Sequence, residues 1–163
     1  TPTTLMGSLE FYNNAKIQFF CSWDVWKHKH STIELYGLEG SMIVPDPNMF
    51  GGSVYVCKKL GKPWKEYKTN KMPLGRINIR SQSSRANESP TNANYRGAGL
   101  SEMLYAIENK TKHRCNSELS LHVLETIEAI MNSAKSKKEK LIKTQFILPK
   151  SFAEKEIRNI KKL

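Results

Sequence analysis

An acidic side chain between two indoles is the first feature of the sequence that could do chemistry. Trp23, Asp24 and Trp26 follow a strongly apolar run. Indole faces can cover the C–H groups of a sugar ring, and a carboxylate can accept protons from its hydroxyl groups. The same residues would also serve as a hydrogen-bonded anchor at the end of a strand. From the residues alone, the two interpretations are evenly balanced.

Two histidines at positions 28 and 30 raise the question of a metal site. On an extended chain His28 and His30 would point to the same side, but no third ligand stands nearby in the sequence. Cys21, Cys57 and Cys115 lie far apart without CxxC spacing. We therefore expect no metal site, and reduced thiols in a cytoplasmic protein.

Tyr95 and Arg96 form a second candidate for substrate contact, directly before an expected helix. An anchor at the end of a loop is the more favoured interpretation of this pair. His113, Arg114 and His122 are expected to be structural and to orient the connection into the next helix.

Cofactor and catalytic motifs are missing from the sequence. There is no GxGxxG after an apolar strand, no GxxxxGK[ST], no HExxH and no GxSxG. The string Gly97-Ala98-Gly99 lacks the third glycine of a dinucleotide fingerprint and indicates the start of a helix. We expect no catalytic and no cofactor-binding residue in this chain.

The elements that would position the candidate residues begin with an antiparallel hairpin. Apolar and polar side chains alternate from Ala15 to Trp23, and Asn13-Asn14 suits a turn with positive φ. The expected partner strand is Leu5 to Phe11. Four more short strands, bounded by glycine and proline turns, are expected at residues 32–36, 41–44, 53–57 and 64–69.

Two amphipathic helices are expected after the strands. The first has apolar residues at the spacing of one buried face, namely Leu100, Met103, Leu104 and Ile107. The second is expected over 117–134 and has a stripe of Leu119, Val123, Ile127, Ile130 and Ala134. Both helices are therefore expected to bury one side.

Strands followed by helices predict the fold class. Residues 70–94 show no periodicity and are expected to form a long loop, and residues 144–148 suggest a last strand. The order predicts an α+β fold with one predominantly antiparallel sheet and helices packed on one face.

A net charge of +11 on 163 residues is concentrated in two places. Residues 58–85 hold nine basic side chains and one acid, and residues 135–163 hold ten basic and three acidic ones. Such segments attract phosphates without sequence preference, although most runs of charge are solvated surface. We expect no membrane partner, and a nucleic-acid partner is disfavoured.

Several stretches, in order along the chain, resemble the C-terminal domain of Gfo/Idh/MocA-family oxidoreductases, the group of glucose–fructose oxidoreductase and inositol dehydrogenase. Together they extend over most of residues 1–134. They are SWDVWKH at 22–28, IELYG at 33–37 with EGS at 39–41, VPDPN at 44–48 with FGG at 50–52, YRGAGL at 95–100, and residues 114–125.

The resemblance implies a substrate-binding and oligomerisation domain. Members of the family have an N-terminal Rossmann domain that binds NAD or NADP, followed by an α+β domain with a large open sheet. The second domain forms the substrate pocket, and its sheet face implies a homo-oligomer. The implied substrate is a sugar, polyol or related hydroxy compound. The implied substrate-facing candidates are Trp26, His28, Tyr95, Trp23, Asp24 and Arg96.

The family's catalytic parts would lie upstream of Thr1. They are the nucleotide fingerprint, the Glu-Lys-Pro stretch with its lysine, and an Asp/His pair. We therefore expect a C-terminal domain over 1–134 that is incomplete at its N-terminal side, a basic extension over 135–163, and a Rossmann domain that is absent from this chain. The chain alone is expected to be inactive in the family's hydride transfer. The alternatives are a stand-alone binding or scaffold domain and, less favoured, a basic nucleic-acid-binding module.

Overall fold

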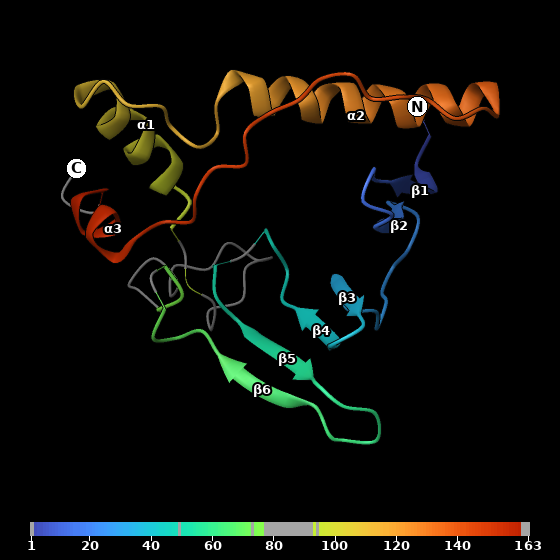
Figure 1. The fold of residues 1–163 in the computed structure, drawn as a ribbon, viewed down its shortest axis with the longest axis horizontal. Coiled ribbons are helices and arrows are strands. Elements are labelled where there is room, and N and C mark those ends of the chain that lie inside the picture. Colours follow the sequence, from blue (N-terminus) through green and yellow to red (C-terminus); the bar gives the residue numbers. More distant parts are fainter. Residues whose placement is uncertain (1, 49, 73, 77–92, 94, 161–163) are drawn as a thin grey trace. The chain divides into compact units, whose positions relative to one another are not determined.

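The computed structural model of the chain describes residues 2–48, 50–72, 74–76, 93 and 95–160. Strands come first and helices after them, and every described strand pairing is antiparallel, so the α+β content is as predicted (Figure 1). The elements are β1 (Thr4–Glu10), β2 (Lys16–Ser22), β3 (Ile33–Gly37), β4 (Gly40–Val44), β5 (Ser53–Cys57), β6 (Lys65–Lys68), α1 (Ala98–Glu108), α2 (Ser117–Ser136) and α3 (Glu154–Ile160).

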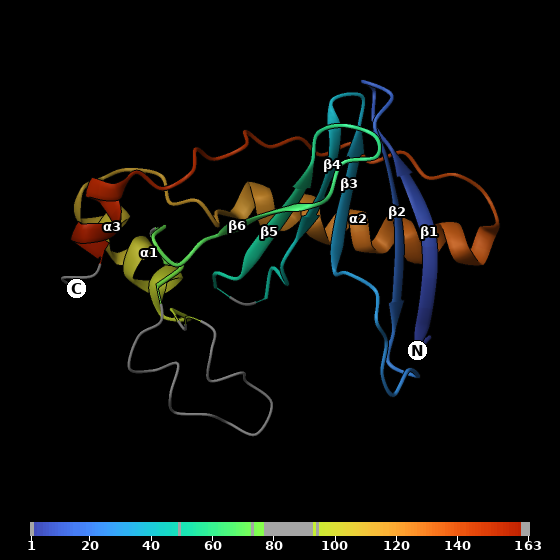
Figure 2. The ribbon, with the colours of Figure 1, turned by 90° about the horizontal axis from the view of Figure 1, so that it is seen from below.

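The strands belong to two sheets. One is the β1–β2 hairpin, and the other has four strands in the order β3-β4-β5-β6 (Figure 2). Residues 23–32 separate β2 from β3 and contain bends but no strand. The strands therefore form two small sheets and not the single sheet predicted from the element order, which the family resemblance implies to be large and open.

The chain divides into two compact units, and each is described by itself. The hairpin unit consists of Thr1–Lys29 and Ser117–Ile147, and so includes β1, β2 and α2. The sheet unit consists of His30–Asn116 and Leu148–Leu163, and so includes β3 to β6, α1 and α3. No described helix is long and apolar enough to cross a membrane.

The register of the hairpin confirms the predicted alternation. Leu5 pairs with Cys21 and Leu9 pairs with Ile17, which places apolar side chains on one face. A Cβ at Gly7 would lie 3.0 Å from the ring of Phe19, so a larger residue at this position would require the ring to shift by a few tenths of an ångström. The predicted turn is also confirmed, because Asn14 adopts a φ of 65°.

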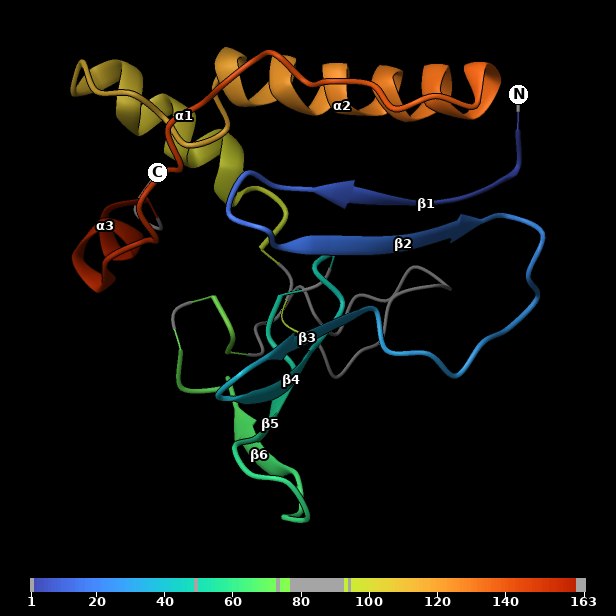
Figure 3. The same cartoon turned by 45° about the vertical axis from the view of Figure 1, so that its right-hand side comes forward.

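The segment after α2 returns along that helix, as Figure 3 shows. The expected strand at 144–148 does not form, and this prediction was wrong. The reason is that Thr144 bonds to side chains of α2 and not to a neighbouring strand. Its backbone N–H donates to Glu125 Oε2 over 2.8 Å, and the ring of Phe146 lies 4.9 Å from that of His122.

The prediction of buried apolar faces on the two helices was also wrong. In α1 the buried residues are Glu102 and Ala106, whereas Ile107 is 64% exposed. In α2 no residue is buried, and Ile127 is 53% exposed. Periodicity identifies which side of a helix is apolar, but burial requires another element packed on that side.

The packed centre of the described chain lies in the sheet unit. Its buried apolar side chains are Ala93, Ala106 and Ile157, the last contributed by α3. The sequence pattern does not predict α3, because a helix of seven residues is too short to show a clear period. Most of the expected loop 70–94 lies outside the described residues.

Candidate functional site

The turn after β2 is held by hydrogen bonds from the start of β1. The hydroxyl groups of Thr3 and Thr4 donate to Asp24 Oδ2 over 2.7 and 2.6 Å. The Asp24 backbone N–H donates to Ser22 Oγ over 3.1 Å, and the Trp23 N–H donates to the Thr3 carbonyl over 2.9 Å. Asp24 is therefore the anchor of a strand end, one of the two roles that the sequence left open.

The two indoles beside this anchor point into solvent. Trp23 is 92% exposed and Trp26 is 104% exposed. The Thr4 hydroxyl, and then that of Thr3, lower the pKa of Asp24, since each donates to the charged carboxylate. At neutral pH the turn thus presents an ionised acceptor and two uncovered aromatic faces.

The other candidates divide between the two units. His28 is exposed near the end of the first segment of the hairpin unit. Tyr95 and Arg96 belong to the sheet unit, where Arg96 is exposed. The Tyr95 hydroxyl donates to the Arg76 carbonyl over 2.9 Å, and its ring stands edge-on to that of Phe50 at 5.8 Å. Tyr95 therefore anchors the chain before α1.

No cluster of three His, Cys, Asp or Glu side chains in the described part of the chain could hold a metal ion. The groups that the turn at Asp24 presents are suited to binding. An ionised carboxylate accepts hydrogen bonds, and exposed indoles stack on flat or ring-shaped surfaces.

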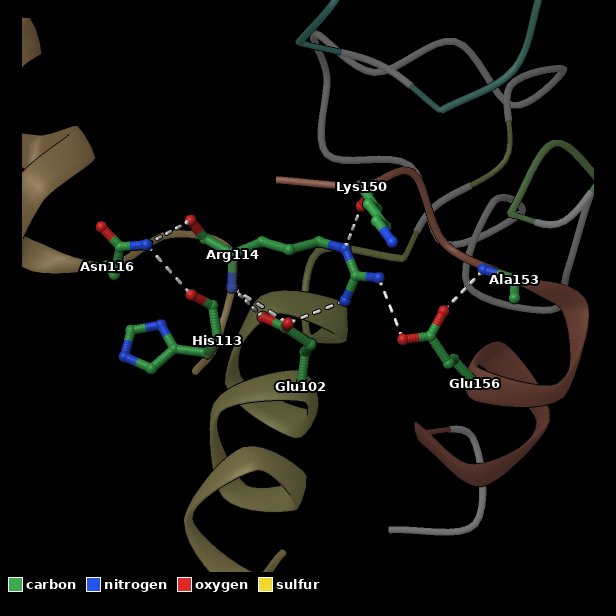
Figure 4. A network of polar contacts seen from close by, with 7 residues as sticks. All are labelled: Glu102, His113, Arg114, Asn116, Lys150, Ala153 and Glu156. Atoms are coloured by element: carbon green, nitrogen blue, oxygen red, sulfur yellow. Dashed lines mark hydrogen bonds and ion pairs between the residues drawn. The ribbon is translucent and has the colours of Figure 1, made fainter. Parts of the chain in front are cut away.

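Sequence reasoning missed the best-connected polar cluster of the sheet unit, the Arg114 network (Figure 4). Arg114 Nη1 lies 3.0 Å from Glu102 Oε1 of α1, and Arg114 Nη2 lies 3.0 Å from Glu156 Oε1 of α3. The Arg114 backbone N–H also donates to both oxygens of Glu102. The structural role predicted for Arg114 is confirmed, but its partners were not foreseen.

Two further contacts complete the Arg114 network. Its Nε donates to the Lys150 carbonyl over 2.8 Å, and its guanidinium carbon lies 3.9 Å from the ring centre of Phe152. The Ala153 N–H, and then Arg114, lower the pKa of Glu156. Glu102, with a side chain only 8% exposed, could have been noticed as an acid set among apolar residues of a helix.

A second carboxylate that joins a helix to a later segment of the chain lies in the hairpin unit. We call this contact, like the Glu102–Arg114 contact of the sheet unit, a carboxylate junction. Glu125 Oε2 accepts the Thr144 hydroxyl over 2.5 Å and the Thr144 N–H, and Glu125 Oε1 accepts the Lys143 N–H over 2.9 Å. These donors, the Thr144 hydroxyl first, lower the pKa of Glu125 to about 2. His122 Nδ1 lies 3.0 Å from Thr144 Oγ1, so the predicted structural role of this histidine is confirmed.

Comparison of the chain with protein-family models, with curated proteins and with solved structures finds no match. These comparisons therefore lend no support to a family assignment, and the resemblance seen in the sequence stays a hypothesis.

Proposed function

We propose that this chain is the C-terminal substrate-binding and oligomerisation part of an NAD(P)-dependent oxidoreductase that acts on a sugar, polyol or related hydroxy compound. The ordered resemblance of residues 22–125 supports the family. The observation that carries the binding role is the anchored turn at Asp24, with Trp23 and Trp26 exposed on either side. In the proposed fold, the described strands belong to one larger open sheet, and the helices pack on one face of that sheet.

The chemistry of the turn fits a polyhydroxy ligand. Both threonine hydroxyls donate to Asp24 Oδ2, and Oδ1 accepts no hydrogen bond from any described residue. Oδ1 can therefore accept a ligand hydroxyl while an indole covers the C–H face of the same ring. The bonds from β1 hold the turn in place, which reduces the entropy lost on binding.

Apolar side chains on the strands support the oligomerisation role. On the hairpin face opposite Leu5 and Leu9, Met6 is 72% exposed and pairs with Phe20, which is 61% exposed. On β3, Tyr36 is 75% exposed. A second copy of the chain would remove such surface from water, and interfaces are enriched in aromatic residues and methionine.

The hydride chemistry belongs to a part of the enzyme outside this chain. NAD or NADP would accept or supply the hydride, and no residue of this chain is proposed to hold it. A titration of the chain with either cofactor should show no binding. Tight binding would contradict this division of roles.

Ligand titration tests the binding role. A panel of pyranoses and cyclic polyols, added to the full chain and followed by NMR, should shift the indole signals of Trp23 and Trp26. Replacing either by alanine should weaken binding by about tenfold, the value of one aromatic contact. The matched control is Trp64→Ala, since Trp64 lies in the sheet unit and is 45% exposed. An equal loss in the control, or no shift with any ligand, would overturn the proposal.

A stand-alone binding domain would use the same turn at Asp24. The coding region upstream of Thr1 distinguishes this alternative from the proposed part of an oxidoreductase. The proposed enzyme requires the reading frame to continue through a strand, a GxGxxG turn, a helix and a Glu-Lys-Pro stretch. A start codon directly before Thr1 would instead favour the stand-alone domain.

A further inference from the structure

The turn between β5 and β6 carries a dense and unneutralised positive charge. Residues 58–71, here named the lysine hairpin, contain one acid, Glu66, whose carboxylate accepts the Ser53 hydroxyl over 2.6 Å. None of the lysines of the lysine hairpin makes an ion pair within the part of the chain that the structure describes. These lysines are Lys58, Lys59, Lys62, Lys65, Lys68 and Lys71.

Internal hydrogen bonds fix the shape of this turn. The Lys62 N–H donates to the Lys59 carbonyl over 3.1 Å, and the Cys57 thiol lies 3.3 and 3.4 Å from the carbonyls of Lys59 and Lys62. Gly61 has a φ of 75°, a conformation that suits glycine. The lysines therefore extend from a formed turn.

Apolar side chains stand among the charges. Leu60, between Lys59 and Gly61, is 100% exposed, and Trp64 is 45% exposed. Tyr67 is 42% exposed, and Lys65 Nζ lies 5.1 Å from the centre of its ring. Transfer of a fully exposed leucine side chain from water into an apolar phase lowers its free energy.

We propose that the lysine hairpin binds the surface of a bilayer that contains anionic phospholipids. The lysines pair with the lipid headgroups, while Leu60 and Trp64 enter the boundary between headgroups and acyl chains, the region that tryptophan prefers. This is contact with one leaflet and not a membrane span. It is independent of the proposed enzyme role, and it revises the expectation that the chain has no membrane partner.

The composition of the hairpin favours a bilayer over a nucleic acid. Residues 53–75 contain no arginine, the side chain that reads bases and phosphates with paired hydrogen bonds. Lysines provide diffuse attraction to a charged surface. A fully exposed leucine has no favourable partner along a phosphate backbone, but it has one in the acyl region of a lipid leaflet.

Vesicle binding tests the proposal with the full chain. Vesicles of phosphatidylcholine with one third phosphatidylserine should bind the protein, and pure phosphatidylcholine vesicles should not. Each lysine near such a surface contributes about fivefold to affinity, so replacing Lys58, Lys59 and Lys62 by glutamine should weaken binding by roughly 100-fold. Leu60→Ser should weaken binding several-fold, and Leu60→Phe should preserve it.

A charge-matched variant supplies the control. Replacing Lys135, Lys138 and Lys140 by glutamine removes the same charge from the hairpin unit, and we expect less than a fivefold loss. Similar losses in both triple variants would overturn the proposal, as would the absence of vesicle binding at low salt. Tighter binding to single-stranded RNA than to vesicles, insensitive to Leu60→Ser, would assign the lysine hairpin to nucleic acid instead.

Discussion

Each compact unit contains a carboxylate junction, and the two junctions differ in their burial and in their hydrogen-bond donors. In the sheet unit the side chain of Glu102 is only 8% exposed and faces the charged guanidinium of Arg114. In the hairpin unit Glu125 is more exposed and is satisfied by one hydroxyl and two backbone N–H groups. Both junctions attach a returning segment of the chain to a helix, α1 in one unit and α2 in the other.

The difference shows how burial sets the value of a polar contact. A buried carboxylate that loses its cation is left as an uncompensated charge in a region of low dielectric constant, which strongly lowers the stability of the folded state. An exposed carboxylate that loses its donors is solvated by water, so the loss is smaller and is felt mainly through its protonation. We therefore expect the Arg114 network to control stability and the Glu125 junction to control a local response to pH.

The largest effect should follow removal of the cation. Arg114→Ala should lower the free energy of unfolding of the sheet unit by about 3 kcal/mol. Glu102 then stays buried without its cation and, among the described residues, keeps only the backbone N–H of residue 114 as a donor. Chemical denaturation followed by circular dichroism measures the loss. Arg158→Ala is the matched control, since it removes an exposed pair with Glu154 in α3 and should cause no measurable loss. Equal effects would contradict the role of burial.

A smaller and opposite effect is expected at the helix ends, one in each unit. Lys110 after α1 and Lys137 after α2 have φ values of 52° and 54°, where a Cβ is strained. Replacing either lysine by glycine should stabilise its unit by about 1 kcal/mol. Lys110→Ala and Lys137→Ala keep the Cβ and should give no gain. Hydrogen exchange shows whether each gain is confined to one unit, as the division of the chain requires.

The smallest effect is a response to acid in the hairpin unit. The pKa of Glu125 is about 2 against an ordinary 4.5, so its contribution is fully present above pH 4.5 and is lost as the pH falls toward 2. The Thr144 amide signal of the folded protein in NMR should titrate with the pKa of Glu125, about 2, and Glu125→Gln should abolish the titration. Glu128→Gln, an exposed acid of the same helix, should leave it unchanged. A titration that survives Glu125→Gln would contradict the assignment.

Local elements were predictable because their signals lie in neighbouring residues. The alternation from Ala15 to Trp23 predicts the hairpin register, and the helical spacing after Leu100 predicts α1. The turn at Asn13-Asn14 follows from the tolerance of asparagine for positive φ. In each case the cause acts over a few bonds.

Features that depend on distant partners were not predictable in the same way. The segment at 144–148 has the composition of a strand, but Glu125 and His122 hold it against α2. The sequence predicted a structural role for Arg114 in a connection, but its ion pair with Glu156 depends on the position of α3. At the candidate site, residue types allow Asp24 to be an anchor, a ligand acceptor or both. The hydroxyl groups of Thr3 and Thr4 show that it is an anchor, and its role as a ligand acceptor stays a proposal.

The sequence by itself determined the strands β1 to β6, the helices α1 and α2 and the charge of the lysine hairpin, because propensity, periodicity and net charge are properties of neighbouring residues. The tertiary structure alone decided that Glu102 and Ala106 are the buried residues of α1, that α2 buries none, and which carboxylate meets which donor. Those outcomes depend on contacts between residues far apart in the chain, and burial gives such contacts their energy.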